Sequence, residues 1–167
     1  MVIRDESIGD HPAISRLITE AFLALPQSSG TEASIFEALR GDAALDLAMV
    51  AEEHGEVVGY LAASAATIGT DANWGLIGPI AVEPSRQRQG IGTALMNEAI
   101  DRLRASSRGA ALVGDPAYYK RFGFRAFPEL TVSGCPPEVV QALPFDGTEP
   151  RGELLHHSAF GLDQKSA

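Results

Sequence analysis

Gln87-Arg88-Gln89-Gly90-Ile91-Gly92 forms a glycine-rich turn between an apolar run at residues 76–82 and a helical pattern at residues 93–104. Glycines at positions 90 and 92 allow backbone N–H groups to face a ligand without a Cβ in the way. The partially positive N-terminus of the following helix points at the same place. The turn therefore predicts a binding site for an anion such as a phosphate.

The length and composition of the chain limit its class. Its 167 residues suit one domain with a full hydrophobic core, so we expect a single domain over residues 1–167. The longest apolar run, residues 74–82, is too short to cross a membrane, and the N-terminus lacks the pattern of a signal peptide. A cytoplasmic protein with no membrane partner is expected. Cys135 is the single cysteine, which excludes an internal disulfide or a cysteine metal cluster, and no metal is expected.

The charge is unevenly distributed. The net charge of −9 argues against a nucleic acid partner. Residues 86–125 nevertheless hold eight basic and three acidic residues, whereas the remainder holds five basic and nineteen acidic ones. This distribution suits a small phosphorylated ligand held by the basic segment, with a neutral or cationic second substrate. Arg102, Arg104 and Arg108 could equally be solvated residues at a helix face and its end.

Apolar periodicity predicts an alternation of strands and helices. We expect strands over residues 2–5, 47–52, 57–67, 74–82, 110–113 and 152–160. We expect helices over residues 10–22, 32–40, 93–104 and 117–122, with a break at residues 25–30 and a proline-punctuated, loop-rich segment after Phe124. Pro79 cannot donate to a strand ladder, which predicts a bulge or an opening there. Strand, helix and strand in succession predict a parallel, right-handed pair.

Two motifs in this order resemble the GNAT superfamily of acyl-CoA-dependent N-acetyltransferases. They are Val82-Glu83-Pro84 with Gln87-x-x-Gly90-x-Gly92, and Tyr119-x-x-x-Gly123-Phe124. The segment Gly114–Phe124, GDPAYYKRFGF, is similar to the YhbS-like group of predicted acetyltransferases. The resemblance implies a mixed α/β fold, with a mostly antiparallel sheet flanked by about four helices. It also implies that a central parallel strand pair splays apart to bind acyl-CoA.

The same resemblance implies acetyl-CoA as cosubstrate and names the residues that hold it. Main-chain groups at the end of the central strand pair with the pantetheine arm, and amides of the turn hold the pyrophosphate. The residues expected to bind the cosubstrate are Ile80, Ala81, Val82, Gln87, Arg88, Gln89, Gly90, Ile91, Gly92 and Thr93. Arg86, Arg88, Lys120 or Arg121 could meet the 3′-phosphate. Many members carry glycine at the position of Arg88, so the path of this turn is a point of difference.

Acetyl transfer requires a neutral amine, a polarised thioester carbonyl and a proton for the departing thiolate. Tyr119 matches the family position that donates this proton, and a phenol stays protonated at neutral pH; as an alternative, Tyr119 or Tyr118 fills core volume. A main-chain N–H near Val82 is expected to polarise the carbonyl. The base stays open among Glu83, His156 and His157, each of which also has a purely structural interpretation.

The sequence thus predicts an N-acetyltransferase that acts on a small-molecule or peptide amine. Because Cys135 is a poor candidate for an acyl-enzyme, direct transfer in a ternary complex is expected. A dinucleotide-binding fold fails, since Leu95 occupies the third glycine position and the first glycine lies far from Val82. A non-catalytic acyl-CoA-binding sensor or interaction module stays open as an alternative. The acidic remainder hints at a cationic acceptor, and the resemblance makes a homodimer possible.

Overall fold

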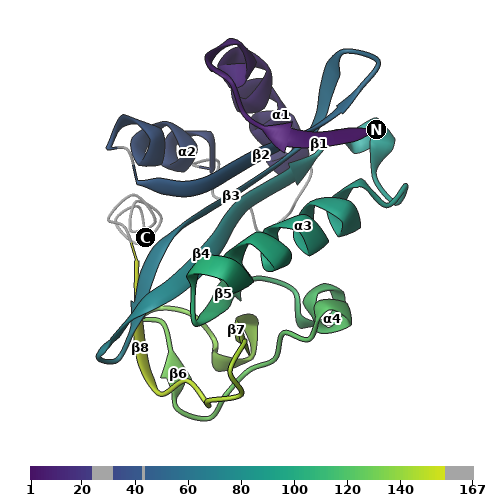
Figure 1. Cartoon of the computed structure of the whole chain (residues 1–167). Coiled ribbons are helices and arrows are strands. Elements are labelled where there is room, and N and C mark those ends of the chain that lie inside the picture. Colours follow the sequence, from purple (N-terminus) through teal and green to yellow (C-terminus); the bar gives the residue numbers. More distant parts are fainter. Residues whose placement is uncertain (24–31, 43, 157–167) are drawn as a thin grey trace.

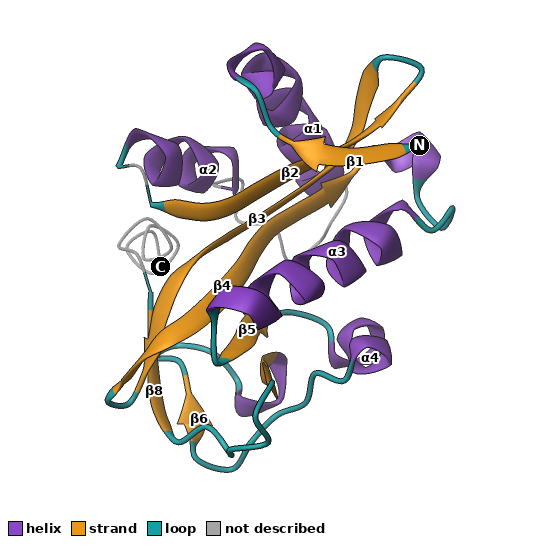
Figure 2. Ribbon diagram, in the orientation of Figure 1, coloured by secondary structure: helices purple, strands orange, loops and turns teal. Residues whose placement is uncertain are grey.

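A computed structural model describes residues 1–23, 32–42 and 44–156, and shows a mixed sheet with helices on both faces (Figures 1 and 2). The strands are β1 (Val2–Asp5), β2 (Leu45–Glu53), β3 (Glu56–Ile68), β4 (Asp71–Val82), β5 (Gly109–Val113), β6 (Leu130–Thr131), β7 (Val140–Pro144) and β8 (Gly152–Leu155). The helices are α1 (His11–Leu23), α2 (Glu32–Gly41), α3 (Ile91–Ser106) and α4 (Pro116–Tyr119). No helix among the described residues is both long and apolar enough to cross a membrane.

The sheet is mostly antiparallel and has one central parallel pair. The order is β1-β2-β3-β4-β5-β7, and β8 pairs with β3 and β6. The neighbours from β1 to β4 are antiparallel, β4 and β5 are parallel, and β5 and β7 are antiparallel. The expected mixed α/β fold is therefore confirmed. The expected parallel pair on either side of α3 is confirmed as well.

Most expected elements lie where the periodicity predicts them, and the differences lie after Phe124. That segment contains two strands that we did not expect, β6 and β7, because each is at most five residues long and carries no long alternation. The closing strand β8 ends at Leu155, and the rest of the expected range, 157–160, lies outside the described residues. The expected break at residues 25–30 also lies outside them.

The two faces of the sheet are buried by different helices, because successive side chains of a strand point to opposite faces. Leu61 and Ala63 of β3 share a core with Leu95 of α3. Tyr60 and Ala62 share another core with helix α1, together with Phe36 of α2. The site described below is formed where α3 begins and where β4 leaves its neighbour β5.

The sheet opens between β4 and β5. Their parallel pairing covers only residues 74–76 and 109–111, although β4 continues to Val82. The second half of β4 therefore keeps β3 on one edge and has no partner strand in the described chain on the other. The register between β3 and β4 shifts across Gly78 and Pro79, which confirms the bulge expected at the proline.

Candidate active site

The turn before α3 has an unusual backbone that positions the helix N-terminus. Gly90 is the residue that precedes the helix, and its φ of 87° lies in the left-handed region that glycine adopts without strain. Arg88 also has a positive φ, of 63°. A left-handed conformation favours glycine, which gives a physical reason for the glycine that many GNAT sequences carry at this position. The first N–H groups of α3 lack partners within the helix.

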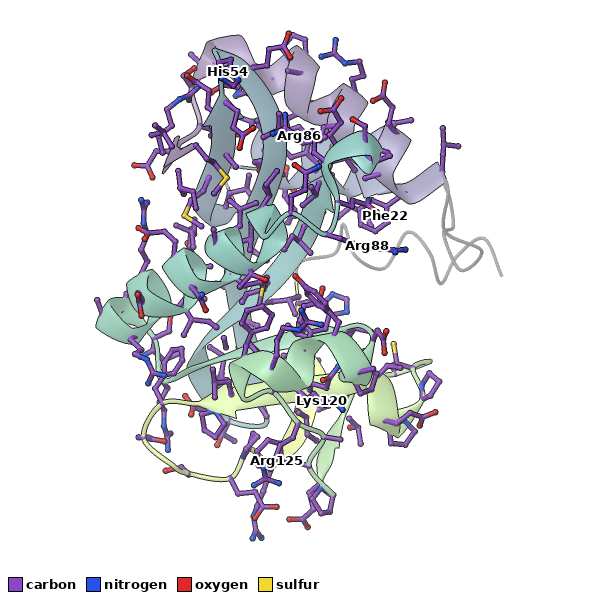
Figure 3. All side chains as sticks on the ribbon, turned by 90° about the vertical axis from the view of Figure 1, so that its right-hand side faces the viewer. Phe22, His54, Arg86, Arg88, Lys120 and Arg125 are labelled. Atoms are coloured by element: carbon purple, nitrogen blue, oxygen red, sulfur yellow. The ribbon has the colours of Figure 1, made fainter. Side chains whose placement is uncertain are left out.

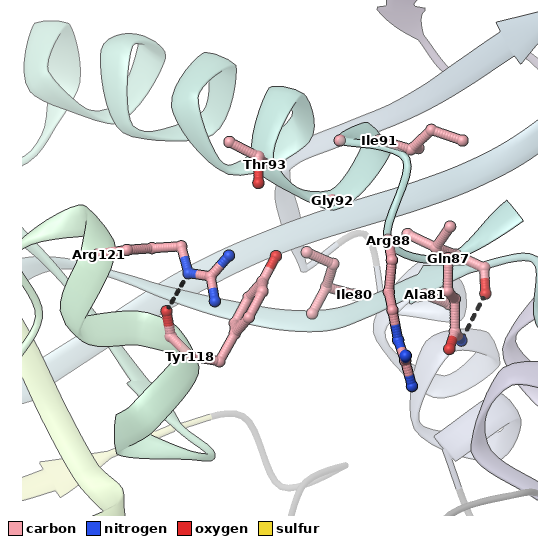
Figure 4. A pocket seen from close by; sticks show the side chains of 11 residues that line it. Ile80, Ala81, Gln87, Arg88, Ile91, Gly92, Thr93, Tyr118 and Arg121 are labelled. Carbon is pink, nitrogen blue, oxygen red and sulfur yellow. Dashed lines mark hydrogen bonds between the residues drawn. The ribbon is translucent and has the colours of Figure 1, made fainter.

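A cavity of about 730 Å³ lies between this turn, the open edge of β4 and α4 (Figure 4). It is lined by Ile80, Ala81, Val82, Gln87, Arg88, Gly90, Ile91, Gly92, Thr93, Tyr118 and Arg121. Nine of the ten residues expected to bind the cosubstrate are among them. Gln89 is not, and its side-chain oxygen instead accepts a hydrogen bond of 3.2 Å from Nε of Arg86.

The wall of this cavity formed by β4 presents main-chain groups that are not used in pairing with β3. The N–H of Glu83 donates to the carbonyl of Val58 in β3 at 2.9 Å. Because N–H groups alternate in direction along an antiparallel strand, the N–H of Val82 points to the open edge. The carbonyl oxygen of Val82 accepts a hydrogen bond of 3.2 Å from the side-chain amide of Gln87 and so does not pair with β3. An extended amide chain could therefore pair with this edge of β4.

The helix α4 places a tyrosine in the cavity through a well-capped start. Asp115 accepts a hydrogen bond of 2.9 Å from the N–H of Ala117, and Pro116 occupies the first helical position. Tyr118 lines the cavity, and its hydroxyl points to the first turn of α3 (Figure 4). The guanidinium of Arg121 stacks over the Tyr118 ring at 4.5 Å. Tyr118 was not expected in this cavity from sequence, whereas Arg121 was one of the four candidates for the 3′-phosphate.

Tyr119, the expected proton donor, does not line this cavity. Its ring packs edge-on against Tyr118 and Phe124, with centroid distances of 4.9 and 6.3 Å. A methyl group added at Gly114, the residue after β5, would lie 2.5 Å from Cε2 of Tyr119. Tyr119 is thus half-buried at the end of β5, beside the opening from β4. Burial raises the pKa of Tyr119 to about 12, so the phenol keeps its proton at neutral pH.

Several residues of the basic segment are engaged with acids. Arg86 forms an ion pair with Glu53. Arg102 pairs with Glu98 at 2.8 Å and also with Asp5. Arg108 lies between two acids as well, Asp71 at 2.5 Å and Asp146 at 3.0 Å. These arginines are paired with acids at separate places and are not gathered around one ligand.

Of the four candidates for the 3′-phosphate, only Arg88 and Arg121 line the cavity. Arg86 is paired with Glu53, as described above. Figure 3 shows Lys120 on the α4 side of the molecule, well apart from the turn that carries Arg86 and Arg88. The structure therefore narrows the choice that the sequence left open to two residues.

Neither Glu83 nor His156, the candidate bases among the described residues, lines the 730 Å³ cavity. Glu83 lines a separate cavity of about 330 Å³, beside Glu20 and Glu56. His156 lines a cavity on the side of the sheet that carries α1 and α2, and His157 lies outside the described residues. Cys135 is half-buried, and burial raises the pKa of its thiol. Among the described residues, no three His, Cys, Asp or Glu side chains are grouped as metal ligands.

The arrangement fits the chemistry of an acyl-CoA. A helix N-terminus behind a glycine turn suits the pyrophosphate, a free strand edge suits the amides of the pantetheine arm, and Arg88 and Arg121 suit phosphate oxygens. A methyl group at Gly90 would meet no atom within 4 Å, so its side of the turn is open to the cavity. A sheet that opens at its parallel strand pair, next to a glycine turn at a helix N-terminus, is the arrangement of a fold that binds an acyl-CoA.

Comparison with known proteins agrees with this class. Residues 12–124 match the acetyltransferase (GNAT) family. The chain therefore belongs to this family of acetyl-CoA-dependent acyltransferases, and the resemblance seen in its motifs is confirmed.

Individual relatives are similar over most of their length. The chain is 37% identical over 127 residues to the uncharacterized N-acetyltransferase YhbS of Escherichia coli K12, covering 74% of this chain and 73% of YhbS. A crystal structure of YhbS from E. coli in complex with CoA matches with a TM-score of 0.87 and 30% identity, over 96% of this chain and 91% of that one. A GNAT family acetyltransferase from Brucella melitensis in complex with acetyl-CoA matches with a TM-score of 0.84 and 38% identity, over 95% and 97%.

Proposed function

We propose that this chain transfers the acetyl group of acetyl-CoA to a primary amine, directly, while both substrates are bound. The main support is the 730 Å³ cavity, which combines the α3 N-terminus with the unpaired edge of β4 at residues 80–82. Two relatives with 30% identity or more are solved with CoA or acetyl-CoA bound, and their folds match over nearly the whole chain. The acceptor is a small-molecule or peptide amine.

The turn and the strand edge have different roles in this proposal. Backbone N–H groups from Gln87 to Thr93 would hold the pyrophosphate, because they converge at a helix N-terminus. Main-chain groups of residues 80–82 would pair with the pantetheine arm and so direct the thioester toward the gap between β4 and β5. When bound, acetyl-CoA supplies an activated acyl group; the protein orients it.

The protein's own groups can supply two of the three requirements of acetyl transfer. The N–H of Val82 is directed to the open edge of β4, where a hydrogen bond would polarise the thioester carbonyl. We propose Tyr119 as the donor of the proton that the departing thiolate needs. Its ring lies at the end of β5 against Gly114, beside the gap, whereas the hydroxyl of Tyr118 lies at the phosphate end, next to Gly92. The amine must lose its proton before it attacks.

Two measurements test the proposal in order. Calorimetric titration with CoA should show binding and titration with NADH should not; the opposite result would reject an acyl-CoA enzyme. A panel of amines with acetyl-CoA, monitored by release of the free thiol, should then show turnover with at least one amine. Binding of CoA with no turnover on any amine would favour a sensor that has lost catalysis.

A further inference from the structure

A second cavity, of about 280 Å³, lies on the side of β4 that faces α1 and α2. The described residues that line it are Phe22, Ile35, Leu76, Ile77, Gly78, Pro79, Val113, Val132, Cys135, Leu154 and His156. They come from α1, α2, the middle of β4, the end of β5 and the segment from β6 to β8. The proposed function assigns no chemistry to this cavity.

The second cavity and the first lie against successive residues of the same strand, β4. Residues 77–79 line the second cavity, and residues 80–82, which follow directly, line the first. Neighbouring Cα atoms are only about 3.8 Å apart, so a group at Pro79 is within reach of both. Val113, the last residue of β5, lines the second cavity across the gap where β4 and β5 no longer pair. A thioester held at this gap would lie beside Val113 and the residues of β4 that line the second cavity.

The described lining of this cavity contains no Asp, Glu, Lys or Arg. Its polar side chains are those of Cys135 and His156, and the others are apolar or glycine. Acidic side chains, which give the chain its negative net charge, line other cavities. Glu20, Glu56 and Glu83 line the 330 Å³ cavity described above, and Asp46 lines a cavity of about 390 Å³ that shares His156.

We infer that the acceptor is an amine carried on an apolar, uncharged body, such as an alkylamine or arylalkylamine, and not a polyamine. This inference rests on the proposed function. An apolar body gains free energy when it leaves water for such a wall, whereas a second ammonium group without a carboxylate partner loses its hydration uncompensated. The same wall disfavours the protonated form of the reacting nitrogen and so favours the neutral amine that attacks. The overall negative charge suggested a cationic acceptor, but the described lining of this cavity carries no acidic side chain.

The inference is tested with two amines of the same length. Hexylamine and 1,6-diaminohexane differ only in a second amino group, which is charged at neutral pH. At saturating acetyl-CoA, kcat/KM should be higher for hexylamine by roughly tenfold or more, because the described lining of the cavity offers the second ammonium no carboxylate. Equal or better use of the diamine would overturn the inference. Asp46, near the shared His156, makes the diamine a fair competitor.

A substitution at Val113 provides a matched control. This side chain lines the cavity but is 46% exposed, so a polar residue there does not disrupt the core. Val113→Asp should shift the ratio of kcat/KM values toward the diamine by about tenfold, because it adds a carboxylate to the wall. Val113→Asn introduces a side chain of the same shape as aspartate but without its charge. It should leave the ratio of kcat/KM values near that of the wild type. An equal shift in both variants would contradict the charge argument.

Failure of the proposed function gives a different result. If CoA binds and no amine is acetylated, the transferase proposal fails. Titration of hexylamine and 1,6-diaminohexane into the CoA-loaded protein then still decides the inference. Tighter binding of hexylamine supports the apolar site, and tighter binding of the diamine, or no binding of either amine, overturns it.

Discussion

A methyl group added at Gly92 would lie 2.9 Å from the hydroxyl oxygen of Tyr118, so these two residues are in close contact across the cavity. The contact joins the first turn of α3 to α4, which lie on opposite sides of β5 in the sequence. Tyr118 is in turn covered by Arg121. The end of the cavity that we propose for the phosphates is therefore formed by α3 and α4 together.

Gly90→Ala is expected to weaken CoA binding by about tenfold, because a left-handed φ of 87° costs alanine roughly 1–2 kcal/mol and the turn shifts away from the conformation that holds phosphate. Gly147→Ala is the matched control. Gly147 has a φ of 78°, also has no atom within 4 Å of an added methyl group, and does not line the cavity. Both variants should lose similar thermal stability, and calorimetry should show weaker CoA binding only for the change at Gly90. Normal affinity in that variant would contradict the phosphate site.

Tyr119→Phe is expected to lower kcat by roughly 10²-fold with little change in CoA affinity, the usual scale for loss of a general acid. Tyr118→Phe should instead raise the KM for acetyl-CoA more than it lowers kcat, because its hydroxyl lies at Gly92 and not at the gap. Steady-state kinetics on both variants separate the two tyrosines. The reverse pattern would assign the proton donor to Tyr118.

Much of the fold could be predicted because its signals are local. The glycines of the turn, the apolar face of α3 and the proline of β4 each act within a few residues, and these elements are confirmed. The strand β7 could not be predicted in the same way. Its five residues are held by pairing with β5, with Val140 opposite Val113, and nothing in the short segment itself indicates this distant partner.

The candidate site could be predicted to the same extent as the fold, where its signals are local. The residues of the turn and of β4 could be predicted because the order of strand, turn and helix along the chain places them together. Which tyrosine of α4 enters the cavity depends on how Tyr119 packs against Gly114, and that contact depends on the end of β5. The ion pair between Arg86 and Glu53 likewise joins residues far apart in the sequence. The sequence pointed to Tyr119 as the tyrosine beside the cleft, whereas the tyrosine that lines the cavity is Tyr118.

Incubation with acetyl-CoA alone should leave the protein unacetylated. Burial raises the pKa of the Cys135 thiol and so reduces the fraction of nucleophilic thiolate. Intact-protein mass spectrometry after rapid quenching measures this directly. Initial rates with both substrates varied should give intersecting double-reciprocal lines. Parallel lines together with acetylated Cys135 would show that transfer proceeds through the enzyme.

The free energy of unfolding should fall as the pH drops below about 4. The guanidinium of Arg4, at 2.8 Å, holds the pKa of the Asp10 carboxyl well below its usual value near 3.9. A carboxyl with a lowered folded-state pKa stabilises the protein above its unfolded pKa, and this stability is lost as it becomes protonated. Asp10→Asn should cost about 2 kcal/mol at pH 7 and flatten the acid decline, measured by urea unfolding. Asp101→Asn, at an exposed helix position, should neither lower the free energy of unfolding at pH 7 nor flatten its decline in acid.

Arg121 is expected to bind the 3′-phosphate of CoA, because it lines the cavity on the side of α4 and its Nε already donates to the Tyr118 carbonyl at 2.9 Å. The wild-type protein should bind CoA about tenfold more tightly than 3′-dephospho-CoA, the scale of one charge-assisted contact. Arg121→Gln should bind the two compounds equally. Lys120→Gln, at the exposed neighbouring position, should keep the wild-type preference. If Arg121→Gln also keeps it, the contact belongs to Arg88, the other cation that lines the cavity.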